Sequence, residues 1–359
     1  MSKVELRVNG AFYGGWKTIR IERGIEQIAG TFELSVTDRW AEQSAVRQIN
    51  PGQPCEVRID EAVVITGYVD TVAPQYDKQQ HTITVSGRDK TGDLVDCSAI
   101  HKSGQWSGRK LDQIAADLCQ PFGITVFRNT DVGSAFNPPF SIEESETVFN
   151  CLERAARMKA VLLVSDGLGN LVLTRAGSGA SVAVLTEGEN ILAGKGEYSW
   201  IDRHSRYVVK GQGVGTDDFN GPQVAHQQAE SIDSTITRYR PLTVLAEDQG
   251  TGATLSQRAQ WERNVRMGRG NRATITVQGW AHDGNLWKPN TMVHLRSPML
   301  YADHDLLIAS VVFLLDEQGT RTELQLVRRE AFDLVAGVSL TGKQNKAKKA
   351  KSDDWSIGF

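Results

Sequence analysis

The sequence has few cysteines, and their spacing excludes the sites that cysteines commonly build. The chain of 359 residues contains four, with no CxxC pair, so neither a disulfide framework nor a zinc centre is predicted. Cys119 and Cys151 fall on apolar faces of expected helices, where a thiol acts as a small hydrophobe. We therefore expect Cys55, Cys97, Cys119 and Cys151 to be buried and inert, and we predict no metal and no cofactor.

Long hydrophobic runs are also missing. No stretch approaches the roughly 18 to 20 apolar residues that a membrane span requires, so stable membrane insertion is not expected. The first residues, MSKVELRVNG, alternate like a strand and lack the features of a secretory signal. This pattern predicts synthesis and assembly in a cytoplasm.

The chain has no excess of positive charge: its formal net charge is −3. Proteins that bind DNA tightly need a footprint of lysine and arginine, and no globular segment carries one. Lysines gather only in residues 341–359, at Lys343, Lys346, Lys348, Lys349 and Lys351. We expect this segment to be a disordered tail, or to become ordered on a partner.

Signatures of catalysis and nucleotide binding are missing as well. The seven histidines include no HExxH motif and no pair four residues apart, and no GxSxG or Walker sequence occurs. His282-Asp283 and His304-Asp305 are interpreted as polar loop groups. Residues 211–215 (GQGVG) follow an expected strand, but no helix follows them, so a phosphate-binding loop is not predicted.

Two clusters leave a carbohydrate-active alternative open. Glu143, Glu144 and Glu146 resemble a glycosidase carboxylate set, but their place in the expected first turn of a helix is explained by the helix dipole. Trp280 and Trp287 flank a turn, GWAHDGNLWKPN, and either form a sugar platform or anchor a core or an interface. We favour the structural explanation for both clusters.

An arginine-rich helix is predicted over residues 255–267, begun at Thr254. The basic residues in and after it are Arg258, Arg263, Arg266, Arg269 and Arg272. With Trp261 they either bind nucleic acid or polysaccharide, or pair with Glu262 and with acidic neighbours or another subunit. We favour the second interpretation.

The most informative positive feature is a repeated order of β-rich segments. The first copy runs from residues 30–40 (GTFELSVTDRW) through a Pro-Gly turn at 51–52, strands at 55–59, 63–72 and 81–89, and DLV at 93–95. The second runs from 271–280 (NRATITVQGW) through Pro-Asn at 289–290, strands at 292–297, 306–315 and 321–330, and DLV at 333–335. Alternating strands alone leave convergence open, but the shared turns and their order favour duplication.

The segment between the copies has a different pattern. Apolar residues at helical spacing predict a helix over 109–119, and Ser141-x-x-Glu144 predicts a capping box that opens a second helix. The apolar face of that helix comprises Val148, Cys151, Leu152, Ala155 and Ala156. The predicted fold is therefore α+β and mainly β, with two similar β-modules and a small two-layer α/β domain between them. Its parts are residues 1–100, 101–178, 179–340 and the tail 341–359.

Several stretches together resemble the baseplate hub proteins of contractile tails. They are 82–96 (TITVSGRDKTGDLVD), 107–118 (SGRKLDQIAADL), 145–174 (SETVFNCLERAARMKAVLLVSDGLGNLVLT), 238–241 (RYRP) and 279–290. The chain is most similar to the hub family of Mu-like phages, also called tail protein P. More distant likenesses are the late control D proteins and the spike proteins of type VI secretion systems. The resemblance covers roughly residues 1–340 and rests on the order of these stretches.

This resemblance implies a structural protein of the virion tail. It implies a homotrimer in which each subunit supplies two barrel-like β-modules, so that six similar units surround a channel. Such a ring matches a sixfold tail tube on one face and a threefold central spike on the other, with baseplate wedge proteins as further partners. DNA is expected only in transit, and a mildly acidic chain suits a conduit that must not hold phosphates. No catalytic residue is predicted.

A second hypothesis remains beside the hub. It is a tail protein that binds or cleaves polysaccharide or peptidoglycan through the tryptophan-rich turn and the carboxylates at 143–146.

Overall fold

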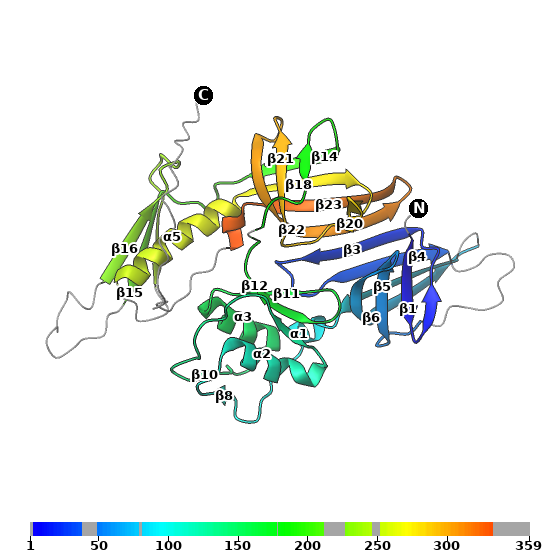
Figure 1. Cartoon of the computed structure of the whole chain (residues 1–359), viewed down its shortest axis with the longest axis horizontal. Helices are drawn as coiled ribbons and strands as arrows, with labels where there is room; N and C mark the ends of the chain where they lie inside the picture. The colour runs from blue at the N-terminus through cyan, green and yellow to red at the C-terminus, as the bar shows by residue number, and fades with distance from the viewer. Residues whose placement is uncertain are drawn as a thin grey trace.

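The computed structural model describes residues 3–37, 49–78, 81–177, 179–211, 227–245 and 252–332. Strands dominate these residues, so the predicted α+β, mainly β class is confirmed at that level. Figure 1 shows a large sheet built from strands of both halves of the chain, a small lobe of helices and short strands against it, and an outlying lobe with the longest helix. Trp40, at the end of the first predicted segment, lies outside the described residues.

The first set of strands forms where apolar and polar residues alternate. Phe32, Leu34 and Val36 share one face of their strand and are buried, whereas Glu33 between them is exposed. Period-two alternation fits a pleated strand with one face in the core. The strands are β1 (Val4–Val8), β2 (Ala11–Tyr13), β3 (Thr18–Gly24), β4 (Thr31–Thr37), β5 (Pro54–Ile59), β6 (Ala62–Tyr76) and β7 (His81–Asp89).

The second set follows the same alternation: Ala273, Ile275 and Val277 are buried on one face. Its strands are β13 (Val184–Thr186), β14 (Ile191–Tyr198), β18 (Asn271–Gln278), β21 (Met292–Ser297), β22 (Ala302–Asp316) and β23 (Gly319–Val327). A small hairpin of β19 (Ala281–His282) and β20 (Asn285–Leu286) forms the tryptophan-rich turn.

One antiparallel seam joins the two sets into a single sheet. The second half of β22 pairs with β3, so that Phe313 lies opposite Ile21. The strand order is β14-β18-β23-β22-β3-β4-β7-β6-β5-β1-β2. β21 pairs with the first half of β22, and β13 pairs with β21. Two separate barrel-like modules are therefore not confirmed. Within the described residues neither strand set closes into a barrel of its own, because β22 pairs with β3 of the other set.

The irregularities of the first set recur in the second. In the β6–β7 ladder the register shifts between Val69 and Thr71, and in the β22–β23 ladder it shifts between Ile308 and Ser310. Each shift inserts one extra residue in the longer strand, as a β-bulge does. The two bulges occupy the same place in matching hairpins, which aligns Val69 with Ile308.

The two turns predicted from proline also match. Gly52 has a φ of 81° and donates its N–H to Val69 O at 2.7 Å. Asn290 has a φ of 63° and donates to Ile308 O at 2.9 Å. Glycine and asparagine adopt this left-handed conformation at the lowest cost. Sequence and hydrogen bonding thus repeat together.

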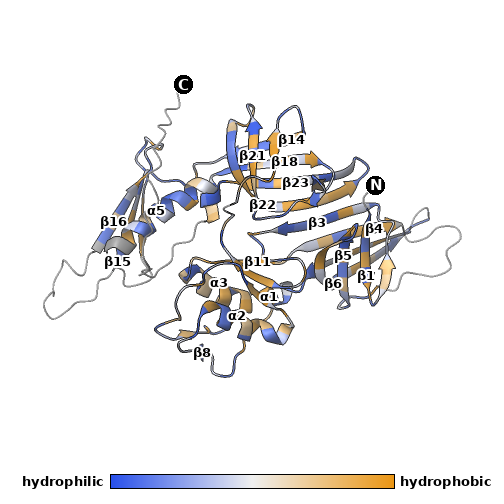
Figure 2. Ribbon diagram, viewed as in Figure 1, coloured by the Kyte–Doolittle hydropathy of each residue, from blue (hydrophilic) through white to orange (hydrophobic). Residues whose placement is uncertain are grey.

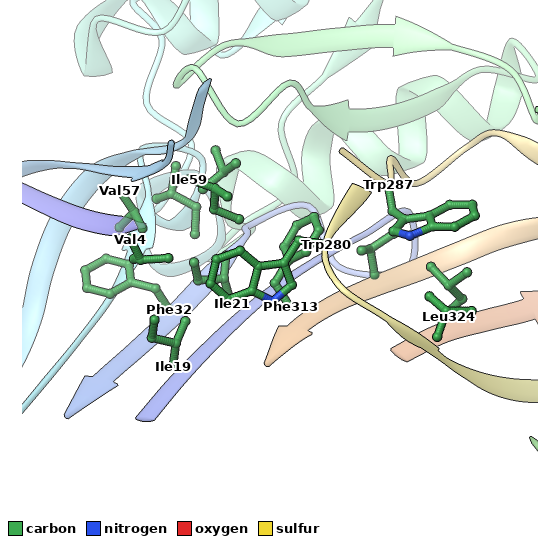
Figure 3. Close-up of a cluster of buried hydrophobic side chains, with 14 of the residues drawn as sticks. Val4, Ile19, Ile21, Phe32, Val57, Ile59, Trp280, Trp287, Phe313 and Leu324 are labelled. Atoms are coloured by element: carbon green, nitrogen blue, oxygen red, sulfur yellow. The ribbon is translucent and has the colours of Figure 1, made fainter. Parts of the chain in front are cut away.

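The largest hydrophobic core extends across the seam. Trp280 is 3% exposed and Trp287 5%, and Figure 3 shows Trp280 beside Ile21 and Phe313. Nε1 of Trp280 donates to Leu314 O at 2.9 Å, which satisfies its one polar group. The interpretation of these tryptophans as core anchors is confirmed. Figure 2 shows apolar residues along the strands of the large sheet.

The two sets differ at one edge strand. Gly194 and Gly196 of β14 hold the ladder positions that Ile19 and Ile21 hold in β3. Leu300, from the loop between β21 and β22, fills this space, and a Cβ on Gly194 would lie 3.1 Å from its Cδ1. The loop therefore supplies the apolar side chain that β3 provides itself.

The small lobe follows β7 directly. Its helices are α1 (Gly92–Asp96), α2 (Leu111–Cys119) and α3 (Val148–Met158), with a 3₁₀ turn η1 (Gln120–Phe122). Its strands are β8 (Gln105–Trp106), β9 (Val126–Arg128), β10 (Phe140–Ser141), β11 (Leu162–Ser165) and β12 (Leu171–Thr174). The predicted apolar face of α3 is buried against α2 in the second core cluster.

Three predictions about this lobe are wrong. Glu143, Glu144 and Glu146 do not lie in the first turn of α3, because they precede its cap. Ser141 does not cap α3, because it lies on β10; the cap is Thr147, whose Oγ1 accepts from Asn150 N at 3.2 Å. Cys97 is exposed, because it follows the five-residue helix α1 at the surface. The other three cysteines are buried as expected, and burial raises the pKa of each thiol to about 12.

A buried carboxylate connects the small lobe to the sheet. Asp89 ends β7 and is 2% exposed. Its Oδ2 accepts from Gly30 N at 2.8 Å, and its Oδ1 accepts from Thr91 N at 2.9 Å. Burial raises the pKa of Asp89 and these hydrogen bonds oppose the rise. The carboxylate therefore holds the start of β4 and the entry to α1 together.

The outlying lobe packs one helix on a three-stranded sheet. β15 (Arg206–Gly211) lies between β16 (Gln227–Ile232) and β17 (Pro241–Leu245), and α5 (Gly252–Arg269) covers them through Leu255 and Ala259. The buried pair Arg203–Asp233, at 2.7 Å, fixes the entry loop. A 3₁₀ turn after β23, η2 (Arg329–Phe332), packs against α5 and connects this lobe to the sheet.

Gly268 tests that connection. A Cβ on Gly268 would lie 2.7 Å from Cα of Ala331 in η2, so we expect Gly268→Ala to lower the free energy of unfolding by about 1 to 3 kcal/mol through overpacking. Helix propensity alone predicts the opposite sign, a gain of about 1 kcal/mol. Urea unfolding measures the change, with Ser256→Ala on the same helix as the control. A Gly268→Ala variant more stable than the natural chain contradicts this packing.

Candidate functional site

The residues that first suggested catalysis are scattered. Asp305 does not orient His304; it contacts Nδ1 of His294 at 2.8 Å, while Asp303 contacts Nε2 of the same ring at 3.0 Å. His282 stacks on Trp287 with ring centroids 5.4 Å apart. In the described part of the chain, no group of three His, Cys, Asp or Glu side chains is arranged to hold a metal ion.

The carboxylates at 143–146 have structural partners. Arg154 donates to Glu146 at 2.8 Å and lies 3.4 Å from Glu143. Burial raises the pKa of Glu146, but the hydrogen bonds from Arg154 and from the backbone N–H of Glu143, with the charge of Arg154, together outweigh it, and the net shift is downward. A general acid needs a raised pKa, so Glu146 is unsuited to that role. Residues 212–226, with most of the glycine-rich loop, lie outside the described residues.

The arginine-rich helix carries internal ion pairs, as the favoured interpretation predicted. Glu262 is 3% exposed and accepts from Arg258 at 3.0 Å and from Arg266, each one helical turn away. Arg272 reaches Glu26 of the loop after β3 at 3.0 Å. The guanidinium of Arg258 also lies 4.5 Å from the ring centroid of Trp261. These contacts explain most of the cluster without a nucleic acid.

Two strand edges are the functional candidates that sequence reasoning missed. The outer edge of β14 has no partner strand among the described residues. The outer edge of residues 71–76, the second half of β6, has none there either, since β5 pairs only with its first half. Unpaired edges are templates for adding a strand from another chain.

Large apolar and aromatic side chains are exposed at both edges. Tyr76 at the end of β6 is 79% exposed. Beside β14 the exposed side chains are Leu192, Tyr198, Trp200 and Ile201, and Met299 and Tyr301 of the adjacent loop. Aromatic residues and methionine are enriched at protein interfaces. The alternation of the strands could have predicted the edges, but not which residues the adjoining loops leave uncovered.

The described residues contain no helix with the length and apolar character needed to cross a bilayer.

His294 offers a pH-dependent test of the contact between β21 and β22. Hydrogen bonds from its ring to the carboxylates of Asp305 and Asp303 raise its pKa above the ordinary value. The protonated ring therefore stabilises the fold below pH about 6.5, and this contribution is lost as the pH rises through the raised pKa. We expect Asp305→Asn to lower the pKa of His294 in an NMR titration. His204, whose pKa burial lowers, is the internal reference; an unchanged His294 midpoint contradicts the contact.

Comparison with known proteins gives three matches along the chain. Residues 3–89 match the N-terminal domain model of Mu phage baseplate assembly protein GpP-like proteins, and 91–175 match the second domain of baseplate hub protein gp44-like proteins. Residues 251–335 match the fourth domain of Mu phage baseplate assembly protein GpP. The order of these matches follows the order of the strands and lobes.

Whole-chain relatives agree. The baseplate hub protein gp44 of Escherichia phage Mu is 36% identical over 339 residues, which is 92% of this chain and 88% of gp44. The 43 kDa tail protein of prophage MuSo2 from Shewanella oneidensis is 39% identical, with a TM-score of 0.84 over 93% of this chain and 100% of that one.

The fold extends further. A type VI secretion component of Escherichia coli, described as similar to the T4 tail proteins gp27 and gp5, has a TM-score of 0.56 at 9% identity, over 93% of this chain and 80% of that one. That likeness concerns the fold alone. The identity with gp44 over most of both chains shows more: this chain belongs to the family of the Mu phage baseplate hub protein gp44.

Proposed function

We propose that this protein is the structural hub of a contractile-tail baseplate, a trimeric ring of six β-modules around the channel through which DNA passes. Membership of the gp44 family supports a structural role in the tail baseplate. The finer architecture rests on one observation. The two strands that correspond to those of the seam between the sets, β14 and the second half of β6, each have an edge without a partner strand among the described residues.

The counterpart follows from the matching bulges. β3 lies along the second half of β22, and residues 71–76 of β6 correspond to that half. β14 corresponds to β3, because each pairs with the matching strand of its own set. Suppose that β14 of another copy pairs with β6 in the register in which β3 pairs with β22. Tyr198 then lies opposite Val72, and Gly194 lies opposite Tyr76.

The backbone is suited to this pairing. Ile25, after β3, donates its N–H to Ala309 O at 2.9 Å, and N–H groups at alternate residues of a strand point the same way. By correspondence the N–H groups of Gly194, Gly196 and Tyr198 face the free edge of β14. Pro74 of β6 has no N–H and leaves one gap in the ladder; proline occurs in sheets mainly at edges.

Such an interface is heterologous: one edge of each copy meets the other edge of the next. Contacts of this kind close into a ring when the rotation between copies permits. Three copies close a ring of six modules, with six similar junctions of which three lie within chains and three between them. Six similar modules suit a sixfold tail tube, while the lobes that occur once per chain repeat three times and suit a threefold spike.

The remaining features agree with a conduit. No strongly basic surface is needed where DNA slides past, and the formal net charge is −3. Partners in this proposal are the tail tube or a tube-proximal protein, the central spike and the wedge proteins, with assembly in the host cytoplasm. Two observations speak against the carbohydrate-active alternative: Trp280 and Trp287 are buried, and Arg154 binds Glu146.

Tyr76→Lys tests the junction. Its side chain is 79% exposed in the single chain, so thermal stability of the monomer should be unchanged. In the trimer the charge would be buried against Gly194 of the next copy, and we expect association to weaken by about 2 kcal/mol. Sedimentation velocity across a concentration series measures this.

Tyr239→Lys is the matched control, because Tyr239 is 85% exposed on the outlying lobe. A natural chain that sediments as a monomer at all concentrations contradicts the proposed ring. If the Tyr76→Lys and Tyr239→Lys variants form equally stable trimers, the proposed junction is contradicted.

A further inference from the structure

A cavity of about 780 Å³ lies beside the free edge of β14. It opens between α5, residues 199–204 and the first residues of β18. Its apolar lining includes Ile201, Leu242 and Val265, and its cationic lining comprises Arg258, Arg266, Arg269 and Arg272. We call this the arginine pocket.

Besides its four arginines, the arginine pocket is lined by three carboxylates, Glu197, Asp202 and Glu262. Glu262 is shared by Arg258 and Arg266, and Arg272 is directed to Glu26. Arg269 has no carboxylate partner among the described residues. Burial lowers the pKa of Arg266, and the neighbouring charges of Arg269 and Arg258 lower it further, while Tyr207 and Asp202 oppose the shift. Crowded cations of this kind are relieved by an anionic group.

An acidic surface of opposite character surrounds α1. Arg88 donates to Asp70 and Asp96 at 2.7 Å each, and Asp93 lies in the first turn of α1. Three carboxylates thus surround one guanidinium. Burial raises the pKa of Asp93, and the charges of Asp96 and Asp70 add to the rise. This surface therefore carries carboxylates, of which Arg269 has none as a partner among the described residues.

The seam within the chain shows how the two surfaces would meet. The loop after β3 packs Ile25 against Ala309, Val327 and Ala331 of η2. When the two strand sets are aligned on their bulges, Asp70 corresponds to Ala309 and Arg88 to Val327. The helix α1 follows β7 as η2 follows β23. Trp200, two residues after β14, corresponds to Ile25.

We infer that the arginine pocket receives the acidic α1 turn of the next copy in the ring, with Asp93 and Asp96 approaching Arg269 and Trp200 lying against Arg88. This inference rests on the proposed function and adds an electrostatic contact to the strand pairing. Opposite charges across an interface fix its register and speed encounter more than they add affinity. The contact therefore selects the correct edge of the next copy.

A cysteine cross-link tests the placement. Cys97 is the exposed cysteine next to α1, and Cys55, Cys119 and Cys151 are buried. Ile201→Cys places a thiol at the rim of the arginine pocket, where Ile201 is 78% exposed. We expect a short bis-maleimide to convert this variant to covalent dimers and trimers, and Cys97→Ser to abolish them. Ile232→Cys, exposed on the outlying lobe, is the position control.

Charge exchange tests the electrostatics. We expect Arg269→Glu to lower the association constant about tenfold, and Asp93→Arg in the same chain to restore most of it. Arg263→Glu makes the same charge change on α5 outside the pocket lining and should have little effect. Higher salt should reduce the difference between the two glutamate variants.

The outcomes separate this inference from the proposed function. The arginine pocket contact alone is overturned if the chain forms a trimer but the Ile201→Cys variant gives no cross-link. It is also overturned if Arg269→Glu and Arg263→Glu change the association constant equally. A natural chain that never associates overturns the ring, and this inference with it.

Discussion

The pairing of β22 with β3 is the constraint on which the rest of the molecule depends. It joins segments almost 300 residues apart by a backbone ladder from Leu315 and Ile19 to Ser310 and Gly24. Register in a sheet with one buried face is strict, because a slip of one residue moves every apolar side chain to the opposite face. The seam therefore fixes both strand sets against one core, and Trp280 is enclosed there. Among the described residues the seam also leaves the outer edges of β14 and of the second half of β6 without a partner strand.

In the proposed ring, duplication gives one chain two forms of the same junction. Matched bulges and matched left-handed turns at Gly52 and Asn290 show that the two sets share backbone geometry as well as pattern. Where they differ, the difference has a local cause: Leu300 replaces the side chains that Gly194 and Gly196 lack. Differences of this kind allow a ring to be sixfold in its strands and threefold in its loops and lobes. A single module repeated six times has no such distinction.

Much of the fold could be predicted from the sequence, because alternation and turn residues act locally. The strands around Phe32–Val36 and Ala273–Val277, the apolar face of α3 and the pairing of Glu262 are of this kind. Cap identity was less predictable, since Ser141 and Thr147 both fit a helix start and only strand β10 decides between them. The seam, the free edges and the arginine pocket depend on contacts between distant segments. No local pattern specifies those contacts, so the candidate site became visible only in three dimensions.

The central claim is that β14 of one copy completes the sheet of the next along β6. Amide hydrogen exchange of β14, followed at protein concentrations below and above association, tests it most directly. The account predicts that the amides of Gly194, Gly196 and Tyr198 exchange fast in the monomer and become protected in the assembly, while those of β18 are protected in both. Equal exchange of the β14 amides in monomer and trimer would contradict it.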